Sequence, residues 1–221
     1  MAFDIYQKIV NQDGEPIEKK AGAYRQQLFE LFVESPEGQA LIDEGIRPGW
    51  ADMMMDYGIN YLGVTPAQMT PDSLREVVFD LIPQKVSADA DEAPEIIHEL
   101  QAFWKFLQRE FQLENADACL KVLDDKAVRT LHKEMSNPAN FGMAKSLVMM
   151  GKARGFDMTT EEGLNEWVKT YNAELAQGIG PRIPPPIPAF SGFQSSSARK
   201  VQDKSKWKMT KNSRRRNRRK R

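Results

Sequence analysis

The chain has 221 residues, of which 41% are hydrophobic and 28% are charged, and its 31 basic and 31 acidic residues balance. This length and composition fit one folded domain with an added polar segment. No run reaches the roughly 18 consecutive apolar residues of a membrane span, and residues 1–10 hold no secretory apolar segment. The single cysteine, Cys119, excludes an internal disulfide, so we expect a cytoplasmic protein without a membrane span.

The balanced total hides a division of charge along the sequence. Residues 199–221, which we call the basic tail, hold thirteen Lys or Arg and one acid, a net charge of +12. The other residues hold 18 basic and 30 acidic side chains, a net charge of −12. Such asymmetry is typical of a basic arm that contacts a polyanion or the acidic part of its own chain.

The first part of the chain predicts three helices. Ser35, Pro36 and Glu37 are typical of a helix start, and Gly45 of the stop that follows. A further helix is predicted over 49–62, before Gly63. The helix before Ser35 is marked by apolar residues at helical spacing, Tyr24, Leu28, Leu31 and Phe32, with Phe29 and Val33 widening the face.

Two further helices follow. Thr70-Pro71-Asp72 begins one that we expect to end at Pro83, because proline removes a backbone donor. Its inward residues are predicted to be Leu74, Val77, Val78 and Leu81. The strongest helix is predicted over 91–111. Its apolar stripe consists of Ile96, Ile97, Leu100, Phe103, Trp104, Leu107 and Phe111.

Helices are predicted over 116–123 and 126–135, and Asn137-Pro138 begins another. The inward residues of this one are predicted to be Phe141, Ala144, Leu147 and Val148. The last helix begins at Thr159 or Thr160, with a buried edge of Leu164, Trp167, Val168, Tyr171 and Leu175. No strand alternation occurs, so we predict an all-α fold: a single orthogonal helical domain of about eight or nine helices over 1–177.

Composition changes after Gln177. Residues 178–198 form a Pro/Ser-rich linker, in which Pro184, Pro185 and Pro186 exclude a continuing helix. The basic tail over 199–221 has few apolar residues and a high charge density, so it cannot bury enough surface to offset its ordering entropy. We predict that it is disordered on its own.

Three segments, RPGWADMMMDYGINYLGVTP (47–66), IPQKVSADADEAPEIIHELQAFWKFLQREF (82–111) and NPANFGMAKSLVMMGKARGFDMTTEEGL (137–164), resemble a family of uncharacterised bacterial helical proteins. The tail KMTKNSRRRNRRKR resembles the basic ends of many bacterial proteins. The resemblance implies a bacterial cytosolic protein and brings no catalytic residue with it.

Motifs that carry chemistry are incomplete. His98-Glu99 begins like a zinc-protease helix, but Ala102 stands where the second histidine belongs. Gly151-Lys152 lacks the remainder of a phosphate loop. We expect an exposed His98, a His132 that packs at the edge of the core, and a buried, unreactive Cys119. No catalytic residue, metal site or cofactor is predicted.

Acidic pairs and methionines remain as candidates. Asp52 and Asp56, and the group Asp89, Asp91, Glu92 and Glu95, are predicted to be solvated helix ends. An enzyme site assembled from Asp52, Asp56 and Glu95 is the less favoured alternative. Met53–Met55 and Met149–Met150 are predicted to fill the core, although a Met-lined surface can also receive a partner helix.

The basic tail carries the functional hypothesis. Trp207 lies between two lysines, which suits stacking on an unpaired base while the cations hold phosphates. The predicted nucleic-acid-binding residues are Lys206, Trp207, Lys208, Lys211, Arg214, Arg215, Arg216, Arg218, Arg219, Lys220 and Arg221. We expect a non-enzymatic accessory protein whose tail contacts RNA, a ribonucleoprotein or another polyanion, and whose helical part meets a protein partner. The alternative is a protein-interaction module whose tail only balances the acidic part.

Overall fold

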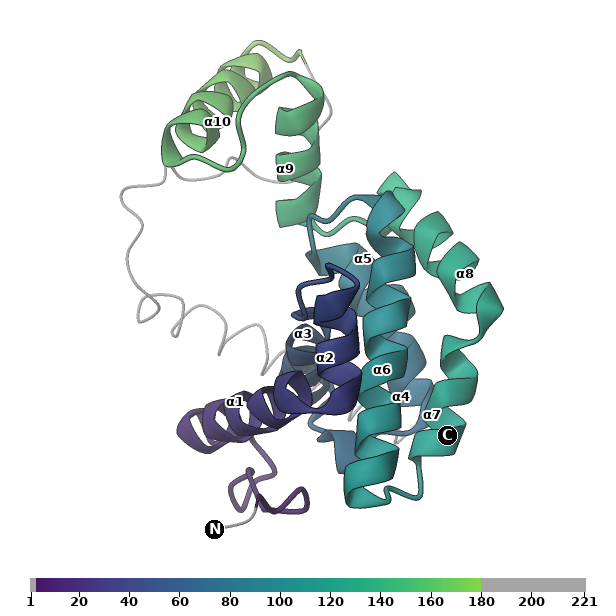
Figure 1. The fold of residues 1–221 in the computed structure, drawn as a ribbon. Helices are drawn as coiled ribbons and strands as arrows, with labels where there is room; N and C mark the ends of the chain where they lie inside the picture. The colour runs from purple at the N-terminus through teal and green to yellow at the C-terminus, as the bar shows by residue number, and fades with distance from the viewer. Residues whose placement is uncertain (1–2, 180–221) are drawn as a thin grey trace, which may run out of the picture. The chain divides into compact units, whose positions relative to one another are not determined.

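The computed structural model describes residues 3–179, and over this range the chain is all-α, as predicted (Figure 1). No β-strand occurs between residues 3 and 179, where the extended backbone forms one isolated bridge between Val10 and Pro16. The basic tail and nearly all of the predicted linker lie outside the described residues. Their predicted limits and the predicted disorder of the tail therefore stay predictions.

Backbone contacts group the chain into two compact units, one up to Met149 and one from Met150 onward. The first unit contains the helices α1 (Glu18–Glu34), α2 (Pro36–Asp43), α3 (Trp50–Tyr57), α4 (Pro71–Arg75), α5 (Ile82–Lys85), α6 (Ala93–Phe111), α7 (Ala116–Leu120) and α8 (Asp125–Ser136). Short π- or 3₁₀-helical turns complete it: η1 (Gly58–Leu62), η2 (Pro66–Gln68), η3 (Glu76–Leu81), η4 (Ala90–Glu92), η5 (Lys121–Leu123) and η6 (Pro138–Asn140). Helix α9 (Met143–Ala153) contains the boundary, and α10 (Glu161–Ala176) belongs to the second unit.

Helix α6 is the centre of the first unit and contacts α2, α3, α7 and α8. The predicted stripe is buried as far as Leu107, whereas Phe111 is half-buried. Phe103 packs edge-to-face on Phe32 of α1, with ring centroids 5.1 Å apart. The helical period of the stripe therefore predicted the buried face of α6 as far as Leu107, and this face supplies much of the core.

The predicted helix boundaries are mostly confirmed. Ser35, Thr70 and Thr160 each accept a backbone N–H at the start of a helix through the side-chain hydroxyl. Gly45 and Gly63 adopt positive φ where the preceding helices stop. Local cap chemistry was therefore sufficient to predict these ends.

One predicted boundary is wrong, because the helix that starts at Pro71 does not stop at Pro83. Segment η3 is a π-helix, in which the N–H of Ile82 bonds to the carbonyl of Val77 five residues earlier. The wider turn shifts the register, so Ile82 and Pro83 are buried where Leu81 was predicted and Leu81 is half-buried. The chain then continues as α5 to Lys85.

Two residues that we predicted to face inward, Leu31 and Ala144, are exposed. Leu31 of α1 has 38% of its surface exposed, while Tyr24, Leu28 and Phe32 are buried as predicted.

Near the end of the first unit, Asn137 begins the 3₁₀ turn η6, and the α-helix starts only at Met143. This later start changes which residues of α9 face inward.

We predicted that Ala144 of α9 faces inward, but Ala144 is exposed and the next residue, Lys145, is buried. The Nζ of Lys145 donates to the carbonyl of Pro83 at 2.9 Å and lies 4.4 Å from the centre of the Phe141 ring. Burial lowers the pKa of Lys145. The carbonyl of Pro83 in α5 and the aromatic face of Phe141 offset part of the cost of burying this ammonium group.

The second unit has a small aromatic core of its own. Trp167 of α10 is fully buried and packs on Tyr171 and Phe156, with ring centroids 5.6 and 5.3 Å away. Gly151 lies against this core, where an added Cβ would come within 2.9 Å of Trp167 and 2.3 Å of Met158. Within this unit, Gly151 is therefore a packing glycine rather than part of a phosphate loop.

Candidate functional site

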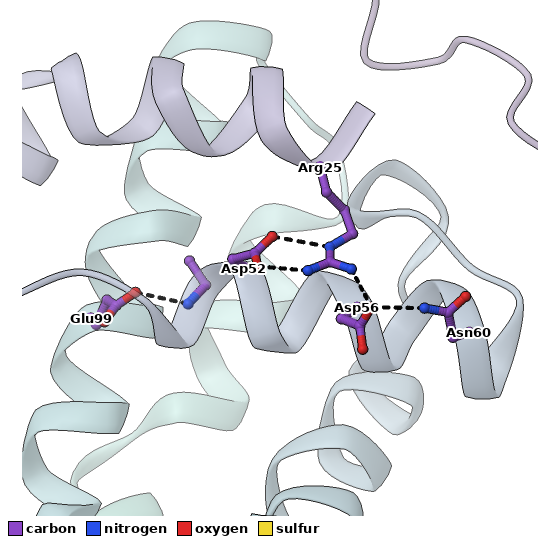
Figure 2. Close-up of polar contacts among 6 residues, drawn as sticks. Arg25, Asp52, Asp56, Asn60 and Glu99 are labelled. Atoms are coloured by element: carbon purple, nitrogen blue, oxygen red, sulfur yellow. Dashed lines mark hydrogen bonds and ion pairs between the residues drawn. The ribbon is translucent and has the colours of Figure 1, made fainter. Parts of the chain in front are cut away.

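Four polar side chains meet along α3 and η1, and we call them the Arg25 cluster: Arg25, Asp52, Asp56 and Asn60 (Figure 2). Arg25 comes from α1, and its guanidinium donates to both carboxylate oxygens of Asp52 at 3.0 and 2.6 Å. It also pairs with Asp56, which accepts a hydrogen bond from Asn60 at 2.7 Å. A single arginine thus joins two carboxylates one helical turn apart and links α1 to α3.

This geometry corrects the prediction that Asp52 and Asp56 are solvated helix ends. Their side chains are only 36% and 30% exposed, and both are bound by Arg25, whose side chain is 24% exposed. Burial opposes the charge of Arg25, but the two carboxylates raise its pKa above the usual value. Neither carboxylate is left as a free base, so the cluster has the character of a structural ion pair and weighs against an enzyme site here.

Glu99 is a second buried carboxylate that faces the start of α3. The side chain is fully buried, and Oε1 accepts the N–H groups of Gly49 and Ala51 at 2.8 Å each. Figure 2 shows one hydrogen bond of Glu99 to the start of α3. Burial raises the pKa of Glu99, and these N–H bonds act in the opposite direction. Gly49 precedes α3 and has no side chain to cap it, so the carboxylate of Glu99 from α6 caps the N-terminus of α3.

A groove with a volume of about 470 Å³ lies between η3 and α8. We call it the η3–α8 groove. It is lined by Arg75, Phe79, Asp80, Val122, Asp124, Lys126, Ala127, Thr130 and Glu134. Its apolar members are the buried Val122 and Ala127 and the half-buried Phe79, while Arg75, Asp80 and Lys126 are exposed. The lining therefore combines a small apolar surface with charges of both signs.

Three arginines elsewhere among residues 3–179 are held by carboxylates, and the two cations of this groove are not. Arg25 and Arg154 each bind a carboxylate, and Arg109 binds Glu37 through two nitrogens at 2.8 and 3.0 Å. By contrast, Arg75 and Lys126 form no ion pair with any described residue. Their charges remain available to a ligand.

Another hollow, about 300 Å³, is lined by Asp91, Pro94, Val128, Arg129 and His132. The Nε2 of His132 lies 3.4 Å from an oxygen of Asp91, and both side chains are at least half exposed. The predicted packing of His132 at the edge of the core is thus wrong, since its ring lines a surface hollow. His98 is exposed, as predicted, and its Nε2 lies 2.8 Å from Glu44.

Other sequence candidates have ordinary structural positions. Cys119 is fully buried, as predicted, and burial raises the pKa of its thiol to about 12, so the reactive thiolate is suppressed. Met54 and Met55 fill the core, while Met53 is half-buried. Asp89 and Glu92 form a capping box at η4, as expected of a helix start.

The sequence did not predict three features of these sites: the participation of Arg25, the capping role of Glu99, and the η3–α8 groove. Glu99 had a local signal, because it lies three residues after Ile96 and four before Phe103, on the apolar stripe. Arg25 is 27 residues from Asp52 and had none. All eleven predicted nucleic-acid-binding residues lie outside the described range, so the structure does not test them.

Within residues 3–179 no group of three His, Cys, Asp or Glu side chains is arranged to hold a metal ion. None of the described helices is both long and apolar enough to cross a membrane. The chain matches no protein-family model, no curated protein and no solved structure.

Proposed function

We propose that the protein is a non-enzymatic accessory protein of the bacterial cytosol. Its basic tail would bind RNA or the RNA of a ribonucleoprotein, and its helical units would bind a protein partner. The observation that carries the proposal is the division of charge, +12 over residues 199–221 and −12 over the remainder. A polyanion is attracted to the first segment and repelled by the second.

The pairing of three arginines within the helical units supports this division of roles, and the unpaired Arg75 and Lys126 share their groove with three carboxylates. Arg25, Arg109 and Arg154 are bound by carboxylates of the same unit, so their charges are not available to phosphates. The tail has thirteen cations and a single carboxylate, Asp203, over 23 residues. Arginine suits phosphate because its planar fork donates paired hydrogen bonds.

Binding of single-stranded RNA is favoured over binding of a duplex. Trp207 is flanked by Lys206 and Lys208, and an indole can stack on an unpaired base whose phosphates are held by the neighbouring cations. No helix-turn-helix, zinc finger or ribonucleoprotein motif adds sequence readout. We therefore expect tight but largely sequence-independent binding.

The test is binding of a labelled, unstructured oligouridylate to the full chain. Replacing the seven cations among residues 214–221 with glutamine should reduce the affinity at least tenfold, because each lost phosphate contact removes counterion release. A matched control keeps Lys206, Trp207 and Lys208 in place and shuffles the order of the other residues in 199–221, and should bind as the unchanged chain does. If the glutamine variant binds equally well, the tail only balances the acidic part and the proposal fails.

A further inference from the structure

The η3–α8 groove has the features of a binding site that the proposed function leaves unassigned. One wall is η3, where Phe79 and Asp80 belong to a π-helical turn. Such turns are rare and concentrate at functional sites, because the extra residue redirects side chains that an α-helix would place elsewhere. The opposite wall is α8, and Asp124 precedes it as the N-cap.

Charges of both signs line this groove without joining each other. Arg75 and Lys126 share it with three carboxylates, yet neither cation forms an ion pair with a described residue. Elsewhere in the first unit, Arg25 and Arg109 are bound to carboxylates at hydrogen-bonding distance. The groove therefore keeps opposite charges apart, and a ligand that carries both charges can satisfy both sides.

The carboxylates of the groove retain capacity for a cation. One oxygen of Asp124 caps α8 by accepting the N–H groups of Lys126 and Ala127 at 3.0 and 3.1 Å. One oxygen of Glu134 accepts the amide of Asn140. Each carboxylate has a second oxygen for a ligand, and the exposed Asp80 adds a third acidic side chain.

These charges select the ligand. Three carboxylates against two cations favour a ligand with more positive than negative charge, and they repel the phosphates of a nucleic acid. The apolar surface of Phe79, Val122 and Ala127 suits an aliphatic side chain, and a hollow of about 470 Å³ is large enough for a few residues.

We propose that the η3–α8 groove binds a short segment of a partner protein in which lysine or arginine flanks an apolar residue beside a carboxylate. The basic groups would lie against Asp80, Asp124 and Glu134, and the carboxylate against Arg75 and Lys126. This inference rests on the proposed function for its biological setting, since it names the chemistry of the protein partner. The charges and the apolar surface of the groove support binding independently of the tail.

The test measures fluorescence anisotropy of labelled peptides with the full chain. The first probe is Gly-Ser-Lys-Leu-Arg, labelled at its N-terminus, with a free C-terminal carboxylate. The second is its C-terminal amide, and the third replaces both basic residues with glutamine. The first probe should bind saturably, and either change should raise the Kd about tenfold, because each removes charge-assisted hydrogen bonds.

Variants of the chain assign the contacts. In the double variant Arg75→Gln/Lys126→Gln, amidation of the peptide should no longer change the Kd, since the partners of the carboxylate are gone. In Asp80→Asn, the effect of replacing the basic residues should shrink. A matched control, Lys19→Gln/Lys20→Gln, changes two exposed cations of α1 outside the groove and should bind all three probes as the unchanged chain does.

The proposal is overturned if the first probe does not bind, or if the double variant and the control respond to amidation alike. Equal competition by free arginine and by unlabelled peptide would also overturn it, because the groove would then be a site for a free amino acid. Oligouridylate binding of the same variants separates this inference from the proposed function. Groove variants should leave RNA binding unchanged, and glutamine replacements in the tail should leave peptide binding unchanged.

Discussion

Arg25 and Arg75 lie in the same helical unit and have opposite surroundings. Arg25 is three-quarters buried and joins Asp52 to Asp56 in the Arg25 cluster. Arg75 is exposed in the η3–α8 groove and forms no ion pair, although acidic side chains line the same hollow. The first arrangement resembles those that hold helices together, and the second leaves charge for an external molecule.

This contrast separates stability from binding within one unit. Removing one partner of a partly buried charge cluster leaves its other members uncompensated, which destabilises the fold. Removing an exposed, unpaired charge costs the fold little and affects a ligand instead. The same class of substitution should therefore give different results at the two places.

The largest effect is expected for Arg25→Met. Asp52 and Asp56 would face each other one helical turn apart without their cation, and the free energy of unfolding should fall by about 2 kcal/mol. Urea denaturation measures this loss. Adding Asp52→Asn and Asp56→Asn should restore part of it, whereas strictly additive losses would show that the three charges are not coupled.

Arg109→Met is the matched comparison for Arg25→Met. Arg109 also makes a two-nitrogen contact with a carboxylate, that of Glu37, and the two side chains are 45% and 18% exposed. Water screens the more exposed guanidinium of this pair, and Arg109 holds one carboxylate where Arg25 holds two. Its loss in the same urea experiment should be clearly smaller than that of Arg25→Met, and an equal loss would remove burial as the reason for the difference.

A smaller, pH-dependent effect is expected for Glu99→Gln. Because burial raises the folded-state pKa of Glu99, its contribution to stability is complete below the unfolded pKa and is lost as pH rises through the folded pKa. Glutamine keeps an oxygen for Gly49 and Ala51 but does not titrate. The stability of the unchanged chain relative to Glu99→Gln, measured by urea denaturation, should therefore fall as pH rises above the usual pKa of a glutamate. A difference that is independent of pH would contradict this account of Glu99.

The smallest effect on stability is expected in the η3–α8 groove. Arg75→Gln/Lys126→Gln should change the free energy of unfolding by less than about 0.5 kcal/mol, because both side chains are exposed and form no ion pair. The same urea denaturation series provides the measurement. A loss as large as that of Arg25→Met would make these residues part of the fold and remove the contrast.

Sequence patterns predicted the fold class and most helix starts because these depend on local features. The stripe of α6 and the hydroxyl caps of Ser35, Thr70 and Thr160 act within a few residues. The register of η3 was not predictable in this way, since a π-turn alters the 3.6-residue period on which the inward position of Leu81 was based.

The candidate sites could be predicted less well, because their members meet only in the folded chain. Asp52 and Asp56 were visible as a carboxylate pair, but their arginine comes from another helix. The η3–α8 groove joins Arg75 to Lys126 and Glu134, which are 51 and 59 residues away in the sequence. Periodicity assigns a residue to the inner or outer face of its helix and does not say which other helix it meets.

We propose above all that the basic tail binds a polyanion without a contribution from the acidic helical units. The most direct test is the affinity of the full chain for oligouridylate as a function of salt concentration. If about ten phosphates are neutralised, log affinity should fall with log salt with a slope near −7. A slope near zero, or a slope that the glutamine replacements among residues 214–221 leave unchanged, would contradict the claim.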